Sequence, residues 1–210
     1  MQPTIRSYRP SDLDAVYDIC VRTADSGGDL RGDTIDDRLV GDIFAVPYVT
    51  LEPQHAYVLD DGAGNAVGYI LGTADTPAFV RRFREEWLPL IKTRYPAPSD
   101  PPVTGSDFWL GLALDPDRML VPELADYPAH LHIDLLPDWQ GKGFGRELMD
   151  AFLAGLAEAG VRAVHLGMLS TNVNARAFYD RLGFHEVDVP NAAPVTYLGR
   201  ETGYSARPRR

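Results

Sequence analysis

The 210-residue chain has one cysteine, few basic residues and no long apolar run. Cys20 has no second cysteine to pair with, so an intrachain disulfide is excluded. It lies on an apolar helical stripe, which predicts a buried and unreactive thiol. No run of about 18 apolar residues occurs, and the first residues lack a basic flank followed by an apolar segment. We therefore expect a cytoplasmic protein with no membrane span and no signal peptide.

Positive charge is also scarce, since the chain has 20 Lys and Arg residues and 30 Asp and Glu residues, which give a formal net charge of −10. Surfaces that bind nucleic acids or anionic membranes are basic, so neither partner is expected. Any bound anion must be held by local groups. Hydrophobic residues make up 45% of the chain, which is enough for a core, and the length fits one domain that can carry an insertion.

The hydrophobic periodicity predicts an α/β chain with a mixed sheet and helices on both faces. The order is β-α-α-β-β, an insertion over residues 76–127, and then β-α-β-α-β-β. Residues 1–205 would form one domain, and residues 206–210 a flexible basic tail. The insertion is too long for a simple connection, which favours a functional role. The expected strands are 4–8, 55–59, 66–73, 108–114, 130–136, 163–168, 184–189 and 195–198, and the expected helices are one capped by Ser11, one from Thr34 to Pro47, one capped by Thr76, 143–159 and 174–182.

The segment PDWQGKGFGRELM, residues 137–149, joins a strand to a helix through a glycine-rich turn. Free N–H groups and the dipole at a helix N-terminus attract anions. Glycines let phosphate oxygens approach these groups without meeting a Cβ atom. The pattern fits neither a P-loop nor a dinucleotide fingerprint, and the alternative is that the glycines serve turn geometry alone. The residues expected to bind the phosphates are Gln140, Gly141, Lys142, Gly143, Phe144, Gly145 and Arg146.

Residues 140–145 match the Q/R-x-x-G-x-G/A signature and so resemble the GNAT N-acetyltransferases. A second segment, NVNARAFYDRLGF over residues 172–184, is similar to that family's N-x-x-A-x-x-x-Y-x-x-x-G-F pattern. The resemblance implies the GNAT acyl-CoA N-acyltransferase fold. It also implies acetyl-CoA as co-substrate, with its pyrophosphate on the glycine loop.

A narrower resemblance rests on the segments HIDLLP, FVRRFREEWLPLIKTRYP and PVTYLGRE. These are similar to the acetyltransferase-like C-terminal domain of O-GlcNAcase and to its free-standing bacterial relatives. This resemblance implies nothing about the acceptor, so a small amine, an amino sugar, a peptide N-terminus and a lysine all stay open.

Polar residues alternate along the expected strand HLHIDLL. His130, His132 and Asp134 share one face with Leu136, which suits the wall of a cleft. Transfer of an acetyl group to an amine needs a base, and Asp134, or else His132, is the candidate. The alternative is that these residues are structural. A metal is not expected at this cluster, because no further ligand is apparent nearby.

The resemblance implies roles for four more groups of residues. Tyr179 would be the general acid for the coenzyme A thiolate, or else would only pack against the cofactor. Asn172 and Asn174 would bind the pantetheine arm or cap the helix, and Phe178 would lie beside the cofactor although its spacing favours the core. The N–H group of Leu135 or Leu136 would meet the thioester carbonyl if the strand separates from its neighbour.

Three aromatic residues of the insertion, Trp87, Phe108 and Trp109, could line an acceptor pocket or belong to the core. The sequence predicts an acetyltransferase that uses direct attack by a primary amine of a small molecule or peptide. The rivals are an acetyl-CoA-binding or protein-interaction module without turnover and an enzyme that uses a longer acyl-CoA. A homodimer is left open.

Overall fold

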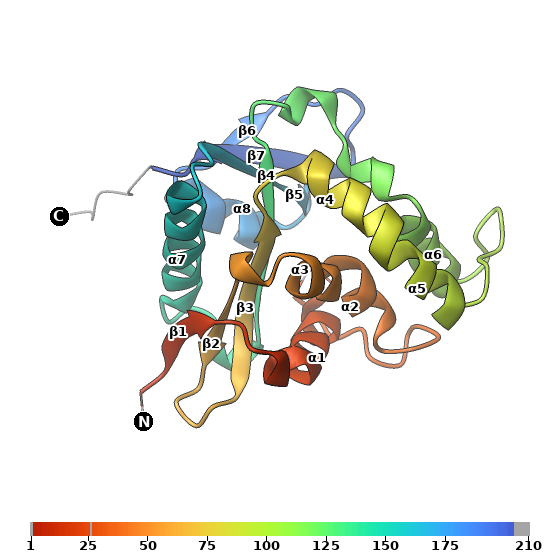
Figure 1. The fold of residues 1–210 in the computed structure, drawn as a ribbon, viewed down its shortest axis with the longest axis horizontal. Coiled ribbons are helices and arrows are strands. Elements are labelled where there is room, and N and C mark those ends of the chain that lie inside the picture. The colour runs from red at the N-terminus through yellow and green to blue at the C-terminus, as the bar shows by residue number, and fades with distance from the viewer. Residues whose placement is uncertain (1, 26, 204–210) are drawn as a thin grey trace.

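A seven-stranded mixed sheet forms the centre of the computed structural model, which describes residues 2–25 and 27–203 (Figure 1). The strand order is β1-β2-β3-β4-β5-β7-β6, and among the described strands only β4 and β5 run parallel. The mixed sheet is confirmed, and the expected tail at residues 206–210 lies outside the described residues. The strands are β1 (Thr4–Ser7), β2 (Ala56–Asp60), β3 (Ala66–Thr73), β4 (Ala129–Leu135), β5 (Ala163–Leu169), β6 (His185–Val187) and β7 (Val195–Glu201).

Helices cover both faces of the sheet (Figure 1). α7 (Phe144–Glu158) and α8 (Val173–Arg181) lie on one face, and the remaining helices lie on the other. Among the described helices, none has both the length and the apolar character needed to cross a membrane. The second face carries α1 (Leu13–Thr23), α2 (Leu39–Phe44), α3 (Val46–Leu51), α4 (Thr76–Arg82), the π-helical turn η3 (Phe83–Trp87), α5 (Leu88–Arg94) and α6 (Gly105–Leu114), and short 3₁₀ turns are η1 (Pro10–Asp12), η2 (Pro53–His55), η4 (Pro116–Met119), η5 (Pro122–Leu124) and η6 (Pro137–Trp139).

β4 and β5 separate along their length. Their parallel pairing covers only Ala129 with Val164 and His130 with His165. Beyond this point β4 stays paired with β3, and β5 stays paired with β7. The sheet is therefore open between the C-terminal halves of these two strands, as the family resemblance implied.

The strand predicted over residues 108–114 is wrong, because these residues belong to α6. Thr104 Oγ1 accepts a hydrogen bond from the Asp107 N–H at 3.1 Å, and Asp107 Oδ2 accepts one from the Thr104 N–H at 2.9 Å. This reciprocal capping box starts a helix. The stretch FWLGLAL is apolar nearly throughout, so its periodicity could not separate a strand from a buried helix.

Three helix boundaries also differ from the sequence prediction. Ser11 makes no cap and lies within η1. Asp75, rather than Thr76, caps α4 by accepting a hydrogen bond from the Ala78 N–H at 2.9 Å. Pro47 does not end the second helix but lies in the first turn of α3. Proline is tolerated there because N–H groups of the first turn have no hydrogen-bond partner within the helix.

The insertion leaves and rejoins the sheet at neighbouring points. Thr73 at the end of β3 pairs with His130 near the start of β4. The Thr76 N–H and the Thr76 hydroxyl both donate to the Pro128 carbonyl, at 2.7 and 2.8 Å. Hydrogen bonds therefore join the two ends of the segment 76–127 at its base.

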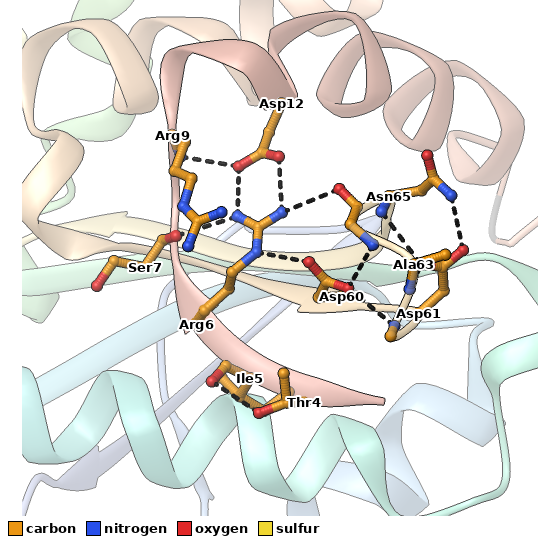
Figure 2. A network of polar contacts seen from close by, with 12 residues as sticks. Thr4, Ile5, Arg6, Ser7, Arg9, Asp12, Asp60, Asp61, Ala63 and Asn65 are labelled. Atoms are coloured by element: carbon orange, nitrogen blue, oxygen red, sulfur yellow. Dashed lines mark hydrogen bonds and ion pairs between the residues drawn. The ribbon is translucent and has the colours of Figure 1, made fainter. Parts of the chain in front are cut away.

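One arginine ties the N-terminal strand to two other elements (Figure 2). The Arg6 guanidinium donates two hydrogen bonds to the Asp12 carboxylate, at 2.7 and 2.8 Å, and one to Asp60 Oδ2 at 2.8 Å. The hydrogen bond from Arg6 holds the pKa of Asp60 below its usual range. Asp60 Oδ1 also accepts from the Gly62 and Gly64 N–H groups, so the network fixes the β2–β3 turn against β1 and the start of α1.

Candidate active site

A cavity of about 710 Å³ opens where β4 and β5 separate. Its lining comes from α1, α2, α3, the insertion, both of these strands and the start of β7. Phe108 and Trp109 line the cavity, whereas Trp87 does not. The Trp87 side chain is buried in the core, and its Nε1–H donates to the Asp42 carbonyl at 2.8 Å. The insertion therefore supplies part of the cavity wall, with two of the three expected aromatic residues.

The polar face of β4 lies on this cavity. His130, His132 and Asp134 all line it, as the alternation along the strand predicted. The opposite face of β4, with Leu131, packs in the hydrophobic cluster beneath α7 and α8. The strand thus separates an apolar core from a row of titratable side chains.

Asp134 is held by Tyr69 on the neighbouring strand. The two residues are directly opposite in the β3–β4 register, and the Tyr69 hydroxyl donates to Asp134 Oδ2 at 2.7 Å. Burial raises the pKa of Asp134 to about 6, against the opposing effect of hydrogen bonds from Tyr69 and Thr23. Such a carboxylate is ionised at neutral pH and more basic than an ordinary aspartate, which suits a general base.

His130 and His132 are joined by the hydroxyl of Tyr48 from α3. The hydroxyl lies 2.7 Å from His130 Nε2 and 3.1 Å from His132 Nε2. His130 Nδ1 lies 2.8 Å from Thr76 Oγ1 at the base of the insertion. The four side chains form one continuous hydrogen-bonded row.

The direction of these bonds follows from the first of them. The Thr76 hydroxyl gives its only proton to the Pro128 carbonyl, which has none of its own, so His130 Nδ1 must carry the proton toward Thr76. His130 Nε2 then accepts from the Tyr48 hydroxyl. The Tyr48 oxygen in turn accepts from His132 Nε2–H, and His132 Nδ1 is left with its lone pair.

The same environment makes His132 a weak base. Burial, helped by the charge of Arg118, lowers the pKa of His132 to about 3. Burial also lowers the pKa of His130 well below its usual value. Both rings are neutral at pH 7, but His132 binds a proton far less readily than Asp134 does.

The glycine loop has the geometry of an anion site. Gly141 and Gly143 have φ values of 71° and 94°, which favour glycine. Within the described chain, the backbone N–H groups of residues 141–145 make no hydrogen bond, and they lie at the N-terminus of the 15-residue helix α7. Lys142 and Arg146 are exposed beside them, and Lys142 Nζ lies 5.6 Å from the centre of the Trp139 ring.

Gly145 has a packing role as well. A Cβ atom at this position would lie 3.2 Å from the Phe178 ring, so Gly145 allows α8 to approach α7. Phe178 is part of this helix contact and is partly exposed. Phe144 packs near Trp139, with ring centres 5.8 Å apart.

The end of β4 carries one candidate oxyanion donor, not two. The Leu136 N–H donates to the Val67 carbonyl at 3.0 Å and is not free. Backbone groups alternate in direction along a strand, so the Leu135 N–H points away from β3 into the opening beside β5. The Gln140 side-chain amide donates to the Leu135 carbonyl at 2.8 Å, which links the glycine loop to this strand end.

The second motif folds into α8. Asn172 Oδ1 caps the helix by accepting from the Ala175 N–H at 3.0 Å, while Asn174 is exposed. Tyr179 is buried, with its ring centre 5.2 Å from that of Phe178 and 5.4 Å from that of Phe184. Burial and the charge of Asp134 raise the pKa of Tyr179, so the two groups are close enough to interact electrostatically.

Sequence reasoning missed Tyr48, Tyr69, Thr76 and Arg118 as parts of the site. They come from α3, β3, α4 and η4, and only the fold brings them to β4. Tyr48, Tyr69 and Arg118 stand in no recognisable motif, and Thr76 was expected only as a helix cap. Thr76 and Tyr69 could have been found only with the strand register in hand.

Comparison with known proteins agrees with this geometry. A family model described as "Acetyltransferase (GNAT) domain" matches residues 119–186, which hold β4, the glycine loop and α8. The crystal structure of SsHAT is 60% identical in sequence, with a TM-score of 0.93, over 97% of this chain and 100% of that one. The chain belongs to the GNAT acetyltransferase family.

Its free cysteine, Cys20, is buried as predicted, and burial raises the pKa of this thiol to about 12.

Two further relatives of this GNAT chain are more distant. Protein O-GlcNAcase from Rattus norvegicus is 28% identical over 205 residues, which cover 94% of this chain and 22% of that protein. The chain thus spans about a fifth of the length of this curated relative. The structure of yncA from Salmonella typhimurium with its cofactor acetyl-CoA shares the fold, with a TM-score of 0.56 at 15% identity over 100% of this chain and 99% of that one.

Proposed function

We propose that this protein transfers an acetyl group from acetyl-CoA to a primary amine by direct attack. The observation that carries the proposal is Asp134, a carboxylate with a pKa of about 6. It lies on the wall of a cavity, on the strand that leads directly into the glycine loop. The acceptor enters the cavity, and the acetyl donor lies along the glycine loop and the opening between β4 and β5.

The donor is held by local positive groups, since the chain as a whole is acidic. The free N–H groups of residues 141–145 and the α7 dipole bind the pyrophosphate. Lys142 and Arg146 add positive charge. That the yncA structure contains acetyl-CoA on the same fold supports this assignment.

In the reaction, Asp134 removes a proton from the amine, whose nitrogen then forms a bond to the thioester carbonyl carbon. The Leu135 N–H stabilises the negative charge on the carbonyl oxygen. The C–S bond breaks, and the Tyr179 phenol gives its proton to the departing thiolate. His132 is the weaker base of the pair because its pKa is about 3.

The test of the chemistry is Asp134→Asn, which keeps the size and most hydrogen bonds but removes the charge. We expect the variant to fold and to bind acetyl-CoA, and to lose most transfer activity in a thiol-release assay with a panel of amines. Asp138→Asn is the control, since Asp138 is exposed in η6 near the same strand. Activity of Asp134→Asn within about threefold of wild type, ~0.65 kcal/mol in the barrier, would remove Asp134 from the mechanism.

The test of the donor site is Gly143→Asp. The side chain would be strained at φ 94° and its charge would repel a pyrophosphate, so calorimetry should show weaker acetyl-CoA binding. Gly160→Asp is a matched control, because Gly160 has φ 78° just beyond the opposite end of α7. Equal affinity in a folded Gly143→Asp variant would end the cofactor assignment, and equal loss in both variants would show strain instead of repulsion.

A further inference from the structure

Arg118, from η4 of the insertion, lines the same cavity as Asp134. Its Nε–H donates to the Leu112 carbonyl at 3.0 Å, and its guanidinium carbon lies 5.3 Å from the centre of the Phe44 ring. No ion pair between described residues includes Arg118. Asp115 acts on it only through its charge.

Arg118 is half-buried, whereas the exposed residues Arg9, Arg81, Arg146, Arg162 and Arg181 also form no ion pair among the described residues. Eight other arginines form ion pairs with carboxylates: Arg6, Arg22, Arg31, Arg38, Arg82, Arg84, Arg94 and Arg176. Most of these lie in more exposed surroundings. A guanidinium stays charged in proteins, and leaving it unpaired in an apolar enclosure is costly. An anion that entered the cavity would gain both charge pairing and two parallel hydrogen bonds.

The cavity carries opposite charges on different walls. Asp134 lies on β4, whereas Arg118 comes from the insertion. Phe44 is close to both Arg118 and His132, with its ring centre 5.3 Å from the Arg118 guanidinium carbon and 5.8 Å from the centre of the His132 ring. His132 and Asp134 are two residues apart on the strand, which corresponds to about 7 Å. The cavity therefore holds one positive and one negative group together with apolar side chains such as Phe44, Trp109 and Leu112.

We propose that the acceptor is an amine that also carries a carboxylate, with Arg118 binding the carboxylate while the amine faces Asp134. This inference rests on the proposed acetyl transfer. Phe44, Trp109 and Leu112 contact the hydrocarbon between the two ends. The planar guanidinium group of arginine matches the geometry of a carboxylate. Because the chain has a net charge of −10, its long-range electrostatic field does not attract anions, so the selectivity for a carboxylate comes from Arg118 itself.

The experiment compares matched acceptors that differ only at the far end. Glycine, 4-aminobutanoate and 6-aminohexanoate are each assayed against their amides by thiol release with acetyl-CoA. For at least one pair, wild type should show kcat/KM at least tenfold higher for the carboxylate, ~1.4 kcal/mol. Arg118→Gln should bring that ratio to near one, and Arg118→Lys should give an intermediate ratio. Arg81→Gln, an exposed site in the same insertion, should keep the wild-type ratio.

Calorimetry with the same acceptors and their N-acetyl products separates this inference from the transferase assignment. Carboxylates that bind wild type but not Arg118→Gln, in the absence of any thiol release, would support the Arg118 site and refute acetyl transfer. Turnover without preference for a carboxylate in any pair would keep acetyl transfer and refute the Arg118 site. An equal loss on carboxylates and amides in a folded Arg118→Gln variant would also refute it.

Discussion

The hydroxyl of Tyr69 donates a 2.7 Å hydrogen bond to Oδ2 of Asp134, across a pair of residues in direct register on β3 and β4. The bond holds the carboxylate in one orientation at the cavity wall. It also favours the ionised form and so opposes the effect of burial on the pKa. Tyr69 is thus a positioning residue for the proposed base.

Replacing Tyr69 with Phe should therefore change the dependence of kcat/KM on pH. Asp134 can accept a proton only when ionised, so kcat/KM should fall as the pH drops through about 6 in wild type. Without the Tyr69 hydrogen bond the midpoint should move above 6, while activity at pH 9 should stay within about threefold, ~0.65 kcal/mol. Tyr57→Phe on β2 is the control and should leave the midpoint in place. An unmoved midpoint in Tyr69→Phe would mean that another group controls the profile.

Asp134→Asn should affect stability as well as activity. The pKa of Asp134 is about 6 in the folded protein and about 3.9 in an unfolded chain. A raised carboxyl pKa stabilises the fold at pH below about 4, and that contribution is lost as the pH rises through 6. At pH 8 the Asn variant should therefore have a higher melting temperature than wild type, with a free energy of unfolding larger by at most about 2–3 kcal/mol. At pH 4 it should show no such gain. Melting curves at both values test this, and a variant that is less stable at pH 8 would contradict it.

Tyr179→Phe should separate chemistry from binding. If the phenol protonates the thiolate, kcat should fall by about 10²–10⁴-fold, because phenylalanine has no proton to give to the leaving group. Acetyl-CoA affinity by calorimetry should change little, since the ring still packs between Phe178 and Phe184. A loss of affinity equal to the loss of kcat would support a packing role alone.

The hydrogen-bonded row from Thr76 to His132 predicts two different histidine tautomers. Nitrogen-15 NMR should find the proton of His130 on Nδ1 and that of His132 on Nε2, with both rings neutral from pH 5 to pH 8. Tyr48→Phe should cost about 1–3 kcal/mol of stability, because it leaves a buried nitrogen without a partner. Tyr127→Phe removes an exposed hydroxyl–histidine bond instead and should cost less. The same tautomer on both rings would refute the assigned bond directions.

Local patterns in the sequence were sufficient for much of the fold. The strand expected over residues 66–73 agrees with β3, and the line Phe144, Leu148, Phe152 and Leu156 runs along the core side of α7. Glycine spacing and strand alternation predicted the loop and the strand face of the candidate site, since both patterns depend only on neighbours in sequence. The sequence alone therefore predicted where β4 ends and where α7 begins.

Contacts that depend on register and long-range packing could not be predicted. Tyr69 faces Asp134 only because β3 and β4 pair as they do, and Tyr48 reaches the histidines from a helix more than eighty positions earlier. The FWLGLAL stretch carries no periodicity, and its helix is specified by the cap at Thr104. Whether the Leu136 N–H is hydrogen-bonded likewise depends on the register with β3, which places the Val67 carbonyl opposite it.

Residues 76–127 form one continuous segment whose two ends meet beside the sheet. Thr76 and Pro128 are joined by hydrogen bonds, so the segment begins and ends at one spot beside the sheet. It brings Phe108, Trp109 and Arg118 to the cavity, while the glycine loop and α8 lie entirely outside it. A different segment grafted between the same two anchors would have to restore the core packing of Phe79, Phe83 and Trp87 as well as this part of the cavity wall. Under the proposed acetyl transfer, a change of acceptor preference would then be confined to one continuous stretch of chain, while the residues proposed to bind the donor stay the same.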